Sequence, residues 1–88
     1  MEDFDFFDLM ELIDKFGLDV DHLCDLPDNS DKDFQLRIVF QREEISKQNT
    51  NENITAFCNA LEKVGIKTER GTAHYRYCPN WIYNTVLV

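Results

Sequence analysis

The chain has 88 residues, of which 43% are hydrophobic and 12% aromatic, and its formal net charge is −8 at pH 7. This length accommodates one domain, 1–88, with a thin core, and the apolar content is too high for a disordered chain. Residues 1–33 hold twelve acids and two lysines (−10), whereas residues 34–88 hold five acids and seven Lys or Arg (+2). Direct nucleic-acid binding by the acidic part is disfavoured, and a basic protein surface is the natural partner.

The three cysteines do not have the number or spacing of a disulfide framework. Acidic residues stand at the start of the chain, where a secretory signal needs basic ones, and no apolar run is long enough to cross a membrane. We therefore expect a cytoplasmic protein with reduced thiols and no membrane association. The domain divides into an acidic, helical segment, 1–33, and a mixed α/β segment, 34–88.

Residues 5–16 predict an amphipathic helix. Gly17 supplies its end, since glycine adopts the left-handed conformation that often closes a helix. Apolar residues recur at helical spacing to form one stripe, which consists of Phe6, Leu9, Met10, Ile13 and Phe16.

Residues 18–29 alternate apolar and acidic side chains before the pattern breaks at Pro27. The alternation allows an extended segment, and the leucines also fit one helical face. We expect a short helical turn or an irregular loop here, followed by a turn after the proline.

Residues 33–41 alternate large apolar and polar side chains, which predicts a strand with one buried face. The alternative is a helix over 31–48, because Ser30 and Asp33 have the spacing of a capping box.

Residues 51–65 predict a second amphipathic helix that ends at Gly65, and residues 73–88 predict two strands joined at Pro79-Asn80. The expected fold is α+β in the order α-β-α-β-β, with two helices packed on one face of a small antiparallel sheet. If residues 31–48 are helical, the alternative is an all-α fold.

Two sets of residues could in principle carry chemistry. His22, Cys24, His74 and Cys78 are of the types that bind zinc, but their spacing is not that of a zinc knuckle. Cys58 could act as a nucleophile, but it lies on the apolar stripe of the second helix, where a thiol is normally inert. We therefore predict no metal site, no cofactor and no enzymatic activity.

The stretch ALEKVGIKTERG resembles the pattern L-N-x-x-G-I-x-T-x-x-G, found near the DNA-binding part of some large serine recombinases. The matching residues are Leu61, Gly65, Ile66, Thr68 and Gly71, and Glu62 departs from the expected Asn. The resemblance implies a helix-turn-helix segment that binds DNA through Lys63, Lys67, Arg70 and Arg76. The competing interpretation is that these are solvated side chains around a loop.

Aromatic residues fall on both sides of the first predicted helix, and not only on its apolar stripe. A helical projection places Phe6 on the buried stripe, whereas Phe4 and Phe7 fall on the opposite side. Three carboxylates accompany them there: Asp8, Glu11 and Asp14. Exposed rings framed by charge are typical of a binding patch with an aromatic anchor.

The negative charge continues through Asp19, Asp21 and Asp25. In an extended segment, alternate residues lie about 6.6 Å apart on one side. Such a ladder of carboxylates could imitate the phosphates of a nucleic acid. The competing interpretations are a solvated acidic face that maintains solubility, or packing of Phe4 and Phe7 onto the sheet.

In size, acidity and lack of a catalytic motif, the chain resembles phage- and plasmid-encoded anti-restriction and anti-CRISPR proteins. The resemblance implies a non-enzymatic inhibitor, monomeric or homodimeric, that acts in the host cytoplasm. It would block a basic, nucleic-acid-binding site of a partner protein. The alternative is a small transcription regulator with an acidic-aromatic docking helix and a weakly basic, DNA-binding C-terminal part.

Overall fold

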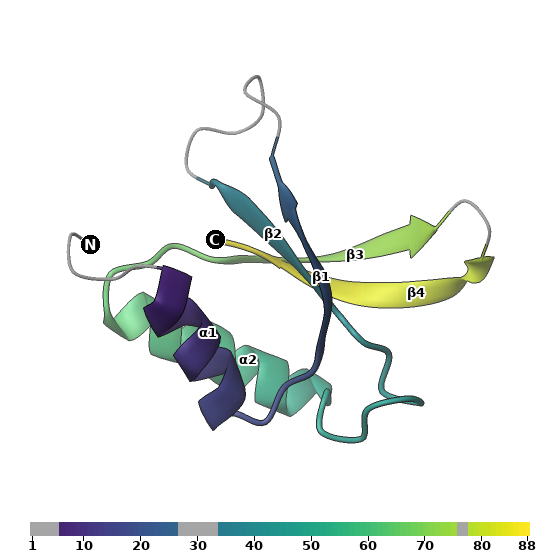
Figure 1. Ribbon diagram of the computed structural model, residues 1–88, viewed down its shortest axis with the longest axis horizontal. Helices are drawn as coiled ribbons and strands as arrows, with labels where there is room; N and C mark the ends of the chain where they lie inside the picture. Colours follow the sequence, from purple (N-terminus) through teal and green to yellow (C-terminus); the bar gives the residue numbers. More distant parts are fainter. Residues whose placement is uncertain (1–5, 27–33, 76–77) are drawn as a thin grey trace.

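A computed structural model describes residues 6–26, 34–75 and 78–88. Within them the chain forms two helices and four strands in the order α-β-β-α-β-β (Figure 1). The elements are α1 Phe6–Lys15, β1 Val20–Asp25, β2 Leu36–Phe40, α2 Asn51–Lys63, β3 Glu69–Tyr75 and β4 Cys78–Leu87. The predicted α+β class is confirmed. The all-α alternative is not supported, because part of residues 31–48 forms strand β2.

The four described strands make one antiparallel sheet in the order β1-β2-β4-β3. The described elements therefore form two αββ units, α1-β1-β2 and α2-β3-β4. The last strands of the two units meet at the centre of the sheet, where Ile38 lies opposite Val86. β1 and β3 are left as the two edges.

Both helices contribute to one hydrophobic cluster with the central strands. Alternate residues of β2, Ile38 and Phe40, are fully buried in it, as is Val86 of β4. The helices add Leu9 and Ile13 of α1 and Ile54, Phe57, Cys58 and Leu61 of α2. Figure 1 shows α1 crossing in front of α2, with the far end of the β3–β4 hairpin extending away from both.

Phe57 of α2 connects the helices to the sheet. Its ring lies edge-on to the ring of Phe16, just after α1, and to that of Phe40 on β2, with centroid distances of 6.3 and 6.0 Å. Edge-to-face packing suits the charge distribution of aromatic rings.

The ends of the helices follow from their sequence. Gly17 has φ +68° and Gly65 has φ +86°, as predicted for residues that close helices. Thr50 caps the start of α2, where its hydroxyl oxygen accepts a hydrogen bond of 3.1 Å from the backbone N–H of Asn53.

Two predictions about the strands are wrong. Residues 20–25, expected to be a loop or helical turn, form β1, because antiparallel pairing with β2 satisfies the backbone groups that face β2. The last two strands do not meet at Pro79-Asn80, which lie inside β4, and β3 begins earlier than expected, at Glu69. A proline is tolerated near the start of a strand.

Asn49, in the connection between the two αββ units, ties this connection to the segment between α1 and β1. Its side chain is 1% exposed and accepts a 2.9 Å hydrogen bond from the backbone N–H of Asp19. Its amide nitrogen donates 2.8 Å bonds to the backbone oxygens of Asp19 and Gln41. The hydroxyl of Ser46 donates to the Asp19 carboxylate. Three of these hydrogen bonds hold the segment after α1 against the loop after β2, and the bond to Gln41 braces the loop itself.

We predict that Asn49→Ala lowers the free energy of unfolding by about 3 kcal/mol, because it leaves buried backbone groups without partners. Urea unfolding followed by circular dichroism measures this loss. Lys47→Ala is the matched control in the same loop, since Lys47 is exposed, and should change stability little. Equal effects of the two substitutions would contradict the role given to Asn49.

Gly17→Ala should cost about 1–2 kcal/mol through backbone strain alone, because no atom lies within 4 Å of an added Cβ. Asn tolerates the left-handed conformation better than Ala, so Gly17→Asn should be less destabilising. Urea unfolding of both variants checks the order. If Asn costs as much as Ala, the explanation by positive φ is wrong.

Candidate partner-binding surface

Two adjacent phenylalanines protrude where α1 begins. The side chain of Phe7 is 79% exposed, as predicted, but that of Phe6, expected in the core, is 51% exposed. The core contacts of α1 start with Leu9, one turn later, so the first turn of the helix projects beyond the cluster. The rings of Phe6 and Phe7 lie edge-on with centroids 6.4 Å apart. Phe4 lies outside the described residues.

The predicted row of acids follows this aromatic pair along α1. Asp8 is half-buried, whereas Glu11 and Asp14 are exposed. Within the part of the chain that the structure describes, the side chains of Glu11 and Asp14 make no hydrogen bond or ion pair. Both carboxylates are therefore exposed without a direct ion pair to a described residue.

Two shallow grooves flank this row. The groove between α1 and α2 has a volume of about 370 Å³, with Leu12 and Val64 beside Asp8, Glu11 and Lys15. The groove between α1 and β1, here called the acidic groove, has a volume of about 490 Å³. Its lining combines apolar side chains with three carboxylates and no basic residue: Met10, Leu18 and Val20 with Glu11, Asp14 and Asp19.

The expected ladder of Asp19, Asp21 and Asp25 does not form on one side of the strand. Asp19 precedes β1 and is held by Ser46 and Asn49. A bulge lies between Val20 and His22, and it shifts the alternation of side chains at Asp21. Asp25 lies opposite Leu36 in the register, and therefore on the side of the sheet that carries the hydrophobic cluster.

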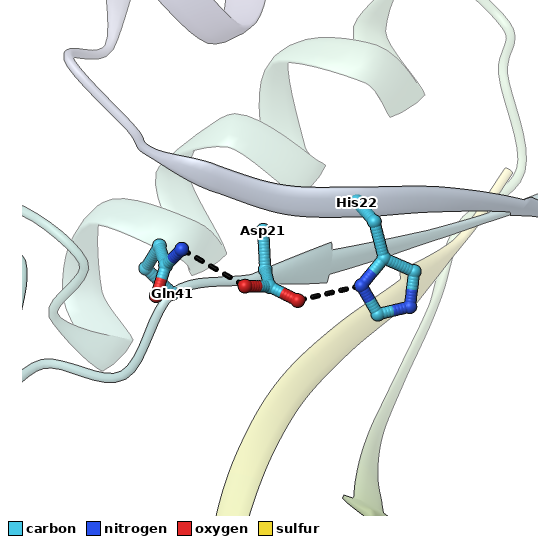
Figure 2. Close-up of polar contacts among 3 residues, drawn as sticks. All are labelled: Asp21, His22 and Gln41. Atoms are coloured by element: carbon cyan, nitrogen blue, oxygen red, sulfur yellow. Dashed lines mark hydrogen bonds and ion pairs between the residues drawn. The ribbon is translucent and has the colours of Figure 1, made fainter.

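Asp21 takes part in a local polar cluster (Figure 2). Its carboxylate accepts a 2.9 Å hydrogen bond from Nε2 of Gln41 and lies 2.6 Å from Nδ1 of His22. The bulge explains how two consecutive residues, Asp21 and His22, come to meet on one side of the strand. Asp21 therefore has an intramolecular role that the sequence pattern did not indicate.

The residues considered as zinc ligands do not come together. His22 and Cys24 lie on β1 and His74 on β3, at opposite edges of the sheet. Three strand spacings of about 4.8 Å separate these edges. No group of three or more potential metal ligands exists among the described residues.

Cys58 lies in the core, as its place on the apolar stripe predicted. Burial raises the pKa of its thiol, and the hydrogen bond with Thr68 and the charge of Arg70 offset part of this effect. A buried thiol with a raised pKa is a poor nucleophile at neutral pH.

The helix-turn-helix interpretation is not supported, because the segment after Gly65 leads into strand β3 instead of a second helix. Arg70 is used internally, since its guanidinium donates to Thr55 (3.0 Å) and to Asn51 (2.8 Å) on α2. Lys67 lies 5.6 Å from the ring centroid of Phe34. Arg76 is outside the described residues.

The sheet also carries an aromatic-arginine contact that sequence reasoning missed. The guanidinium carbon of Arg42 lies 4.0 Å from the ring centroid of Trp81 and 6.0 Å from that of Tyr83, and Arg42 also pairs with Glu44 at 3.1 Å. No local sequence pattern predicts this contact, since the partners are about forty positions apart in the chain. The stack covers Tyr83, which is buried.

Comparisons with protein-family models, with curated proteins and with solved structures gave no significant match. Among the described residues, neither helix has the length and apolar character needed to cross a membrane.

We predict that Cys24 reacts with a thiol reagent at least about tenfold faster than Cys58 in the folded protein, because Cys24 is only half-buried and Cys58 has a raised pKa. The measurement uses Cys78→Ser protein, so that only these two thiols report. In urea the two rates should converge. Equal rates in the folded protein would show that Cys58 is accessible.

Proposed function

We propose that the protein is a non-enzymatic inhibitor that covers a basic, nucleic-acid-binding site on a partner protein with the outer surface of α1. This surface consists of Phe6, Phe7, Asp8, Glu11 and Asp14, together with the acidic groove. The observation that carries the proposal is the acidic groove, whose lining combines three carboxylates with apolar side chains and contains no Lys, Arg or His. Two exposed aromatic rings, Phe6 and Phe7, lie at the start of the same helix.

Two parts of this surface favour different features of a partner. Neighbouring carboxylates attract Lys and Arg and accelerate encounter at low salt. The apolar floor suits the aliphatic stem of a long basic side chain. Exposed phenylalanines supply contact area, and such aromatic anchors often contribute most of the energy of an interface. The combination selects a basic surface with an apolar pocket.

A nucleic-acid-binding site is the partner surface that fits best, because such sites are basic so that they can neutralise phosphates. The carboxylates of α1 would take the positions of phosphate groups in that site. This is the mode of action that the resemblance to anti-restriction and anti-CRISPR proteins implies, and in this proposal the protein acts in the cytoplasm of a host cell. In this proposal, the carboxylates that imitate phosphates are those of α1 and of Asp19, because Asp21 and Asp25 do not extend the row.

The test compares the wild-type chain with a variant that carries Asp8→Asn, Glu11→Gln and Asp14→Asn. Each chain is immobilised and exposed to host lysate at low and at high salt. We expect the wild type to retain a nucleic-acid-binding protein that high salt releases, and the variant to lose it, because attraction between exposed charges is screened by salt. The wild type, added in solution, should then compete with nucleic acid for the purified partner.

The matched control carries Glu43→Gln, Glu52→Gln and Glu69→Gln, which remove the same charge from exposed positions elsewhere. Each set includes one acid from the first turn of a helix, Asp8 or Glu52, so their effects on helix stability are comparable. The control should bind like the wild type. Equal loss in both variants would show that only net charge matters, and a partner whose nucleic-acid binding is unaffected would contradict the proposed inhibition.

A further inference from the structure

His22 has the surroundings of a metal-binding histidine. The 2.6 Å contact with the Asp21 carboxylate places the proton of the neutral ring on Nδ1, and Gln41 holds the other oxygen of that carboxylate at 2.9 Å (Figure 2). Nε2 is then the nitrogen that carries the lone pair. Histidines that bind metals are commonly oriented by a carboxylate in this way.

Cys24 lies on the same side of β1 as His22. The two residues alternate along the regular part of the strand, where they lie opposite Val39 and Arg37 of β2. Residues two apart in a strand lie about 6.6 Å apart with their side chains parallel. Cys24 is a free, half-buried cysteine. One imidazole and one thiol, both zinc ligands, therefore stand side by side.

This pair is half of a ligand set. Structural zinc sites are almost always tetrahedral with four protein ligands, and the described residues of one chain contain no group of three. β1 is an edge of the sheet, so the side of the strand away from β2 has no strand beside it within the described residues. A second copy can supply both a strand and the missing ligands.

We propose that His22 and Cys24 bind zinc together with the same two residues of a second copy, with the two β1 edges paired antiparallel. When Leu23 lies opposite its counterpart, His22 of each copy lies opposite Cys24 of the other. Residues opposite one another in an antiparallel pair have Cβ atoms about 4.5–5.5 Å apart. All four ligands then lie on one side of the joined sheet, and binding releases the protons of the two thiols.

The metal is needed for the association because the edge carries charge. Asp21 and Asp25 flank the ligand pair, and acidic residues on an edge strand discourage pairing between copies. The two thiolates formed on binding balance the charge of the zinc ion, so the four coordination bonds, and not the charge of the metal, offset the repulsion between the carboxylates. The inference is independent of the function proposed for α1, since it concerns the β1 edge alone.

The experiment measures the mass of the reduced full-length chain in solution by light scattering, first with a chelator and then with zinc. We expect a monomer with the chelator, and a dimer with one zinc ion per two chains after zinc is added. Cobalt in place of zinc should show the charge-transfer absorption of a thiolate ligand. A mass that zinc does not change, or a different zinc ratio, overturns the proposal.

Substitutions locate the site. Cys24→Ser and His22→Gln should abolish zinc binding and the dimer, whereas His74→Gln, on the opposite edge, should leave both unchanged. Asp21→Asn keeps both ligands and should weaken zinc affinity about 10–100-fold, as expected for a positioning residue. Circular dichroism verifies folding of each variant, and the cobalt spectrum of the wild type gives the answer if Cys24→Ser does not fold. Retention of the thiolate band in folded Cys24→Ser overturns the assignment.

Discussion

The pairing of β2 with β4 is the contact on which the structure depends. Each αββ unit by itself is a hairpin with one helix, which is too small to bury its apolar face. Joining the units through Ile38 and Val86 makes a four-stranded sheet, and both helices bury their apolar stripes in the same cluster. Asn49 fixes the connection between the units on the first of them, through hydrogen bonds with backbone atoms of Asp19, after α1, and of Gln41, after β2.

This arrangement also decides which side chains remain available to a partner. Because Leu9 and Ile13 are buried, α1 must present Glu11 and Asp14 to solvent. Its first turn projects beyond the cluster, which leaves two aromatic rings exposed beside the acids. The candidate surface therefore follows from the packing of a helix with one apolar stripe. Its negative charge comes from the side chains of α1 that are not buried in the core.

The sheet order has a second consequence. With β2 and β4 at the centre, β1 becomes an edge, and the bulge at Asp21 turns two consecutive polar residues to one side. The carboxylate that seemed part of a continuous acidic ladder is thereby directed to His22 and Gln41. The acidic residues in the first third of the chain are consequently divided between two surfaces, the outer side of α1 and the β1 edge.

The sequence alone determined the elements that local periodicity specifies. The stripe around Leu9 and Ile13, the stop at Gly17, strand β2 and helix α2 all follow from side chains within a few positions of one another. The exposure of Phe7 and the separation of charge between the two parts of the chain follow in the same way. Tertiary structure decided whatever depends on distant partners. Strand β1 forms because β2 pairs with the backbone groups on one side of it, and Phe6 is exposed because no described element covers the first turn of α1. Asp19 and Asp21 are held by residues about 20–30 positions away, which no local pattern reveals.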